Sequence, residues 1–467
     1  MTSRFVVALM AVVLAGCAVG PNYKRPQVAV PDTFRGAAET TAAQASLADT
    51  KWDALFGDET LNGLIRTALE RNFDARIAAE RVQQARAQLG ITRADQFPFV
   101  DAQAQFTAAR QSSLGALRFV PVGTNLSATF TQLGAALSWE VDLWGRLRRL
   151  TEAARARYLA SEEGRRAVTV ALIADVTNAY FQLLEYELEL EISRKTRDAA
   201  AESLRIVQLR RDQGAASGLD VRQAEQLIRT TATQVEAVER GIAQTENLLS
   251  YLLGSAPSAQ PRGQRLDQVP LPAEFPAGLP SSLLERRPDI RAAEQNLIAA
   301  NAEIGAARAL FFPQISLNAF AGGQSRALTQ IASSPARVYS LAPAAILPIF
   351  RAGQIRSQVR LTEAQQRELL VTYEQSIYNG LREVSDALVG YSRTRSQRAE
   401  QEQLVRALEE TVRLSTLRYR GGLDSYLQVL DAQRNLFTGE LGLAQLRLAE
   451  RLSVVQLYRS LGGGWQL

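Results

Sequence analysis

The sequence predicts an internally duplicated, mainly α-helical fold with a small β component. Three observations lead to this prediction. Two runs of 68 residues contain no proline, the second run repeats the first after 208 residues, and polar and apolar residues alternate in short segments between the helical runs.

The longest helical pattern lies between Gly353 and Gly422. Residues 354–421 are rich in Ala, Leu, Gln, Glu and Arg, which favour helix. Apolar positions near its end follow the 3-4 spacing of a heptad seam. A continuous helix of this length would measure about 100 Å. Because a glycine turn and the helix-capping residue Ser425 follow, we expect a second helix to return toward Leu461.

The same unit occurs earlier in the chain. Gly145 and Gly214 enclose an equivalent run, and they lie 208 residues before Gly353 and Gly422. Farther upstream the offset between the repeats is 215 residues, as between Gly90 and Gly305. We therefore predict a first repeat over residues 58–254 and a second over 281–467. Prolines cluster between them and mark 255–280 as a connector.

The N-terminus has the features of a secreted lipoprotein. Residues 1–16 combine Arg4 with an apolar stretch and read as a signal peptide, and LAG precedes Cys17 as in a bacterial lipobox. This resemblance implies cleavage before Cys17, acylation of Cys17 and anchoring in outer-membrane lipid. The alternative is an ordinary signal peptide with a chance cysteine. Residues 17–57 read as an extended tether without a core of its own.

Each repeat also contains a candidate β-hairpin, at about 100–142 and about 314–347. Alternation over about ten residues is the weak signature of an outer-membrane strand, although a half-buried sheet of a soluble domain shows it too. Four strands cannot close a barrel, and an open edge cannot lie in lipid. Strands that span a membrane would therefore require several chains, and three copies would supply 12 strands.

Several function classes are excluded or disfavoured. The chain has no histidine and one cysteine, so Ser-His and Cys-His catalytic pairs and nitrogen–sulfur zinc sites are excluded. We expect no enzyme activity, no cofactor and no metal. A net charge of +5 spread over 467 residues does not indicate a nucleic-acid surface. No apolar run of 18 residues follows the signal peptide, so no transmembrane helix is expected.

A family resemblance is carried by motifs in a fixed order along the mature chain. The chain resembles the outer membrane factor lipoproteins of the TolC and OprM type, with the closer likeness to OprM. The motifs are the lipobox, VGPNY at 19–23, WEVDLWG at 139–145, ERRPDI at 285–290, PIF at 348–350, RYRGG at 418–422, LDAQR at 430–434 and LGGGW at 461–465.

The resemblance implies a TolC-like fold and a homotrimer, with a 12-stranded outer-membrane β-barrel and a 12-helix periplasmic α-barrel. It also implies the exit duct of a tripartite multidrug efflux pump. The partners would be a periplasmic adaptor (membrane fusion protein) and an inner-membrane resistance-nodulation-division transporter. The same duct could instead serve type I secretion or metal export. A periplasmic adaptor lipoprotein is disfavoured, because it would have one helical hairpin rather than two.

Two sets of site residues follow. The glycine turns are expected to contact the adaptor because they lie at the hairpin tips. Leu427 and Asp431 align with the aperture of OprM, with Leu219 at the equivalent position of the first repeat and Arg434 placed to neutralise the ring of acids. The alternative for Asp431 is a solvated helix face. The tip residues are Gly214, Ser217, Gly218, Gly421, Gly422 and Ser425.

Overall fold

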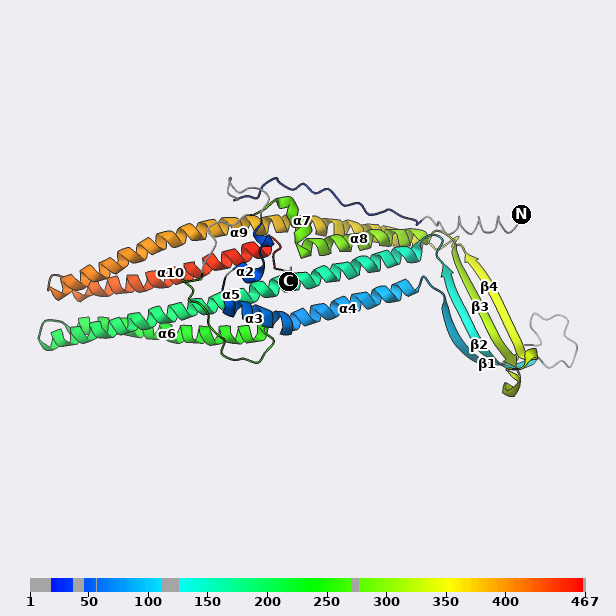
Figure 1. The fold of residues 1–467 in the computed structure, drawn as a ribbon, viewed down its shortest axis with the longest axis horizontal. Coiled ribbons are helices and arrows are strands. Elements are labelled where there is room, and N and C mark those ends of the chain that lie inside the picture. The colour runs from blue at the N-terminus through cyan, green and yellow to red at the C-terminus, as the bar shows by residue number, and fades with distance from the viewer. Residues whose placement is uncertain are drawn as a thin grey trace. The chain divides into compact units, whose positions relative to one another are not determined.

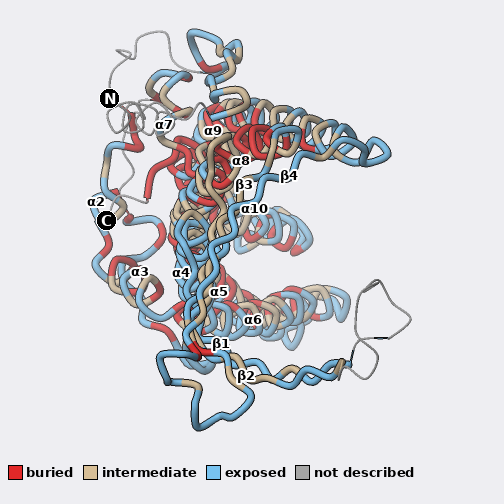
Figure 2. The backbone as a smooth tube through the Cα atoms, turned by 90° about the vertical axis from the view of Figure 1, so that its right-hand side faces the viewer, coloured by how far each residue is buried: buried red, intermediate tan, exposed pale blue. Residues whose placement is uncertain are grey.

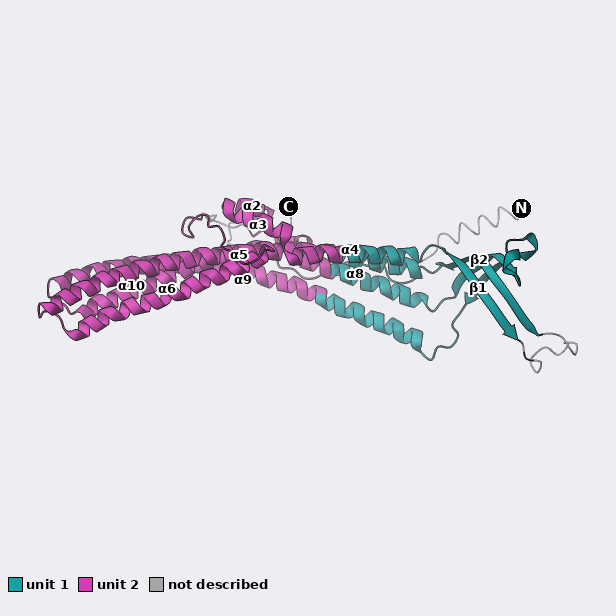
Figure 3. Cartoon of the chain, turned by 90° about the horizontal axis from the view of Figure 1, so that it is seen from below, with its two compact units in different colours: residues 1–26, 83–160, 294–372 teal, residues 27–82, 161–293, 373–467 magenta. Residues whose placement is uncertain are grey.

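The computed structural model describes residues 18–36, 46–55, 57–110, 112, 126–269 and 277–464. The signal peptide and Cys17 lie outside these residues. The chain forms two compact units (Figure 3). One unit comprises residues 1–26, 83–160 and 294–372, and the other comprises 27–82, 161–293 and 373–467. Each unit takes segments from both sequence repeats, so the units do not follow the repeat boundaries.

The first unit contains a four-stranded antiparallel sheet (Figure 1). The two predicted hairpins join side by side, so that β2 pairs with β3 across the repeats. Gly134 lies opposite Gly322 in this pairing, and a Cβ on either residue would clash with the facing backbone. Among the described residues, the outer strands β1 and β4 each leave one edge unpaired. The strands are β1 Phe99–Arg110, β2 Ser127–Val141, β3 Gln314–Ser325 and β4 Arg337–Ile346.

Long helices continue from the strands. The predicted 68-residue runs form α5 (Arg146–Asp212) and α9 (Gln354–Arg420), each 67 residues long. The Asp142 carboxylate accepts hydrogen bonds from the backbone N–H groups of Leu147 and Arg148 and so caps the start of α5. The returning helices are α6 (Gly218–Leu252) and α10 (Tyr426–Ser460). Both predicted hairpins are therefore present.

Shorter helices precede the sheet segments in each repeat. Asn72 separates α3 from α4 and accepts hydrogen bonds from the first N–H groups of α4. Pro288 occupies the first position of α8, where its missing N–H costs no hydrogen bond. The bounds are α3 Glu59–Arg71, α4 Phe73–Ala94, α7 Leu283–Arg286 and α8 Pro288–Ala309, with short elements η1 Leu47–Asp49, α2 Trp52–Leu55, η2 Pro280–Ser282, η3 Leu328–Gln330 and η4 Ser334–Ala336.

Helix α5 is the one described helix whose length and composition would allow a membrane crossing. However, 61% of its apolar window is buried inside the chain. Tyr180, Phe181 and Leu183, for example, are fully buried in the second unit. The apolar content of α5 therefore serves as core.

The N-terminal segment, predicted to be an extended tether, makes specific contacts with the helices. Within the first unit, the Tyr23 hydroxyl and the Arg25 guanidinium donate to the Glu294 carboxylate at 3.1 and 2.7 Å. Gly20 lies so close to Gly305 that a Cβ on Gly20 would lie 2.4 Å from the Gly305 Cα. Within the second unit, Phe34 is buried. The segment is extended, but specific polar contacts and one apolar anchor hold it on the helices.

Candidate functional site

The turn between α5 and α6 is a glycine-terminated helix end followed by a capped helix start. Gly214 has φ of 76°, in the left-handed region that glycine adopts without strain. The Ala215 N–H donates to the Arg210 carbonyl at 2.7 Å. Ser217 then caps α6 in a reciprocal arrangement with Asp220. Backbone hydrogen bonds therefore close the end of α5, and a side-chain cap closes the start of α6.

The turn between α9 and α10 has the same backbone pattern but different side-chain contacts. Gly422 has φ of 75°, and the Leu423 N–H donates to the Arg418 carbonyl at 3.0 Å. Ser425 makes no side-chain cap. Instead, Arg418 donates two hydrogen bonds to the Asp424 carboxylate, at 2.6 and 3.0 Å. The Arg418 guanidinium lowers the pKa of the Asp424 carboxyl, so this pair is charged at neutral pH.

Arg210 connects the two tips within the chain. Its guanidinium donates to the Tyr419 carbonyl at 2.8 Å and lies 4.6 Å from the centre of the Tyr419 ring. The Tyr419 ring in turn contacts Tyr426 edge-on at 5.5 Å. A buried cluster continues beneath these contacts and contains Ala200, Val207, Val221, Ala224, Leu227, Tyr426, Val429 and Leu430.

The predicted gate residues lie on the exposed side of α10. Leu427 is 43% exposed, and Asp431 and Arg434 are exposed as well, whereas Val429 and Leu430 face the buried cluster. Leu219, at the start of α6, is 66% exposed. Across the described part of the chain, no ion pair joins Asp431 to Arg434. Within one chain, the predicted tip residues therefore lie in the α5–α6 and α9–α10 turns. The predicted gate residues lie near the starts of α6 and α10, and their side chains are exposed.

The contacts of Arg210 and of Asp424 were not predicted from the sequence. The offset of 208 residues does pair Arg210 with Arg418, and it pairs Asp424 with Ala216. The first tip therefore has no counterpart of the Arg418–Asp424 pair at these two positions. The partner of Arg210 could not be found in this way, because it lies on another helix.

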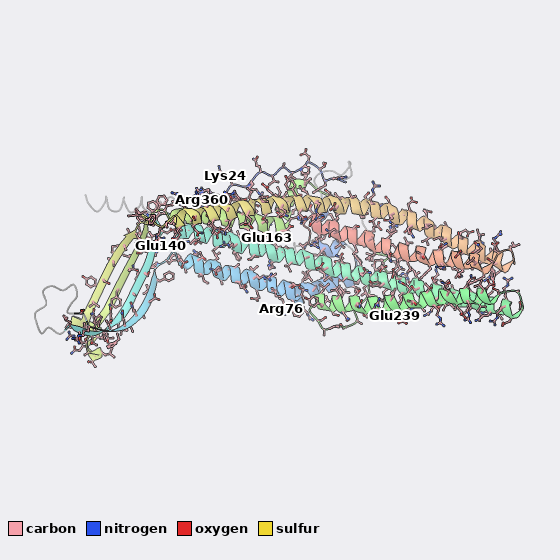
Figure 4. The ribbon with its side chains drawn as sticks, turned by 180° about the vertical axis from the view of Figure 1, so that it is seen from behind. Lys24, Arg76, Glu140, Glu163, Glu239 and Arg360 are labelled. Carbon is pink, nitrogen blue, oxygen red and sulfur yellow. The ribbon has the colours of Figure 1, made fainter. Side chains whose placement is uncertain are left out.

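The four strands expose apolar side chains in the single chain, and Figure 2 shows the sheet largely exposed. Phe106, Tyr339 and Leu341 are 69%, 87% and 67% exposed. At the end of β2, Glu140 (Figure 4) accepts two hydrogen bonds from Arg146 at 2.9 and 2.7 Å and so joins the strand to α5. An exposed apolar sheet with two open edges requires a partner for its edges and an apolar surrounding for its face.

Comparison with known proteins identifies the family. A model described as outer membrane efflux protein matches residues 64–255 and 279–463. The chain belongs to the outer membrane efflux protein family. It is 39% identical over 461 residues to the solvent efflux pump outer membrane protein SrpC of Pseudomonas putida, covering 97% of both chains. It is 35% identical over 460 residues to the cation efflux system protein CusC of Escherichia coli O157:H7, covering 98% of both.

Solved structures of outer-membrane channels superpose on the efflux-family chain over nearly its whole length. The outer-membrane channel OprN gives a TM-score of 0.88 at 31% identity, covering 97% of this chain and all of that one. The open state of MtrE from Neisseria gonorrhoeae gives 0.85 at 32% identity, covering 96% and 99%. The predicted TolC-like fold, outer-membrane location and efflux function are thus confirmed: the chain is an outer-membrane efflux channel.

Proposed function

We propose that this efflux channel works as a homotrimer, in which three four-stranded sheets close one 12-stranded barrel. The observation that supports this proposal is the sheet itself, which exposes apolar side chains and leaves the edges of β1 and β4 unpaired. In lipid, each unpaired backbone group costs several kcal/mol, about the value for burying a polar group without a hydrogen bond. Pairing β4 of one copy with β1 of the next removes both edges.

The trimer forms the exit duct of a tripartite efflux pump. Its tips, the turns at 213–218 and 421–425, meet a periplasmic adaptor that is itself bound to an inner-membrane resistance-nodulation-division transporter. The compact turns, one closed by the Ser217 cap and the other by the Arg418–Asp424 pair, support this role because they present a defined surface. The solutes are small organic molecules, since relatives are named for solvent, toluene and antibiotic efflux. A deletion strain that is no more sensitive to toluene or antibiotics than its parent would contradict this choice of solutes.

Two further assignments complete the proposal. Cys17 carries the acyl chains that anchor the N-terminus in the outer membrane. Leu427 and Asp431, with Leu219 from the first repeat and Arg434 nearby, form the periplasmic constriction. Three acids in one ring repel one another, so a neighbouring cation must stabilise the closed state. Because Arg434 has no ion pair within the described chain, it can serve a second copy's Asp431.

Mass spectrometry tests both the trimer and the anchor. The purified protein in a membrane mimetic should give a native mass of three chains, and the denatured chain should carry a mass increment that matches acylation. Cys17→Ser should remove that increment and leave the trimer intact, because Cys17 precedes every described contact. A monomeric native mass contradicts the shared barrel, and an unchanged increment in the variant contradicts the anchor.

A further inference from the structure

A cavity in the first unit has no part in the functions proposed above. Its volume is about 540 Å³, which is within the range of sites that hold drug-sized molecules. It lies where the strands pass into the helices, between α5, α8 and the first turns of α9. Its apolar wall includes Leu150 of α5, Ala307 and Leu310 of α8 and Ile355 of α9.

Four glutamine side chains also line this cavity. Gln314 is the first residue of β3, and Gln354, Gln358 and Gln365 share one face of α9. Within the part of the chain that the structure describes, none of these four amides has a side-chain partner. All four are exposed, so that water hydrates them in the free protein and a polar solute can replace this water.

Arg351 carries the unpaired charge of the cavity. Three charged side chains line it in the described chain, namely Arg146, Glu303 and Arg351. Arg146 forms an ion pair with Glu140, and Glu303 forms one with Arg157. Arg351 is exposed and has no ion pair among the described residues. The cavity therefore combines a free cation with neutral amides and an apolar wall.

The backbone next to Arg351 is strained. Ala352 has φ of 45° and is the one non-glycine residue with positive φ in the described chain, and Gly353 follows with φ of 83°. Strain of this kind is typical of ligand sites and persists where the surrounding structure holds it. The equivalent turn of the first repeat has Leu143 and Trp144 in place of Arg351 and Ala352, so the cation belongs to the second repeat alone.

The cavity lies on the side of α8 that faces away from the N-terminal segment. Asn301 of α8 donates to the Pro21 carbonyl at 3.0 Å. Glu303 in the cavity follows Asn301 by two positions, about 200° around the helix. An acylated Cys17 would lie in lipid outside the proposed barrel, so the segment that follows it covers the outer side of α8. The cavity then faces the inside of the proposed duct.

We propose that this cavity is a contact site for small organic carboxylates that pass through the duct. The proposal rests on the exit-duct function proposed above and names one class of its solutes. The Arg351 guanidinium binds the carboxylate through charge-assisted hydrogen bonds, the amides orient polar substituents, and Leu310 and Ile355 contact the apolar body. The contact is weak, because a duct that retained its solute would not conduct.

Saturation-transfer NMR on the purified channel in phospholipid nanodiscs tests the site, with nalidixate as the carboxylate probe. Arg351→Gln should weaken nalidixate binding about tenfold, the effect of losing one charge-assisted hydrogen bond. The uncharged methyl ester of the probe should bind the parent and this variant equally. Arg360→Gln is the matched control and should bind nalidixate like the parent, because Arg360 (Figure 4) is exposed on the opposite face of α9.

A second variant tests the cavity itself. Gln358→Trp places a large side chain at an exposed position, so the fold should be kept while the cavity is filled. It should abolish the binding of both nalidixate and its methyl ester. Normal trimer yield of each variant verifies assembly.

The outcomes separate this inference from the proposed function. Parent-like binding of nalidixate by Arg351→Gln overturns the role of Arg351, and parent-like binding by Gln358→Trp overturns the cavity as the site. An equal loss in Arg360→Gln shows a general attraction of anions and also overturns the proposal. These results leave the exit duct standing, because binding is measured without adaptor or transporter. A deletion strain as resistant as its parent to nalidixic acid and to chloramphenicol contradicts the proposed function, and this inference with it.

Discussion

At the scale of single residues, a buried pair of acids on α5 has no basic partner among the residues that the structure describes. Glu185 and Glu189 are 2% and 5% exposed and lie one helical turn apart. Gln182 donates to Glu185 at 2.9 Å, and Gln445 donates to Glu189 at 3.2 Å. Burial, and then the neighbouring Glu189, raise the pKa of Glu185 to about 8, from an ordinary value of 4.5. The pair therefore holds a proton at neutral pH.

This proton makes the stability of the second unit depend on pH. The folded chain keeps a proton that the unfolded chain releases above pH 4.5, so the stabilisation is complete below pH 4.5 and declines up to about pH 8. The slope is about 1.4 kcal/mol per pH unit. Glu185→Gln removes the titrating group and keeps its shape. We expect its Tm to exceed that of the parent at pH 8.5 and to match it within a few degrees at pH 5.

Thermal unfolding of both proteins between pH 5 and 8.5 measures this effect. Glu236→Gln is the matched control, because Glu236 is an exposed glutamate on α6. The control should follow the pH profile of the parent. Parallel profiles for Glu185→Gln and the parent would show that Glu185 is charged at neutral pH in the folded protein.

At the scale of elements, the two helix turns depend on glycine for a conformational reason. A Cβ at Gly214 or Gly422 would meet nothing within 4 Å, so the positive φ alone opposes other residues. The left-handed conformation costs an ordinary L-residue about 1–2 kcal/mol, and asparagine adopts it more readily. There is therefore space for a side chain at both glycine positions, but the positive φ disfavours a β-branched residue there.

Substitution at the second tip should separate adaptor binding from assembly. Gly422→Val should lower resistance to exported antibiotics severalfold while the trimer yield stays normal, because the tip changes shape and the strands do not. Gly422→Asn serves as the control and should retain resistance. Crosslinking of Leu423→Cys to the adaptor measures docking directly. Full crosslinking and full resistance with Gly422→Val would remove this turn from the adaptor contact.

The sequence predicted the elements better than the contacts between them. The bounds of α9 could be predicted because Gly353 and Gly422, both with positive φ, enclose a run without proline. The strands could be predicted from their alternation. The contact of Arg210 with Tyr419 could not be predicted, because it joins residues 209 positions apart on different helices. The docking of Gly20 was also missed, since an extended segment carries no periodic signal.

At the scale of the whole molecule, opening of the proposed constriction would depend on which contacts between the tips can separate. Within one chain, the tips are joined by Arg210 and the buried cluster around Tyr426. Leu427 and Asp431 lie on the other side of α10, where a trimer would present three copies of each. A constriction made of these side chains can widen without exposing the buried cluster. Docking of the adaptor then needs only to bind the wider state more tightly.

Removing the constriction should raise the resting conductance of the channel. Leu427→Ala combined with Asp431→Ala deletes two exposed side chains, so the fold should be unaffected and the single-trimer conductance in planar bilayers should rise severalfold. Gln428→Ala, a change on the same exposed turn of α10, is the matched control and should leave the conductance unchanged. Correctly assembled double-variant trimers that conduct like the parent would place these residues outside the gate. Equal increases in the double variant and the control would instead point to a general loosening of the tip.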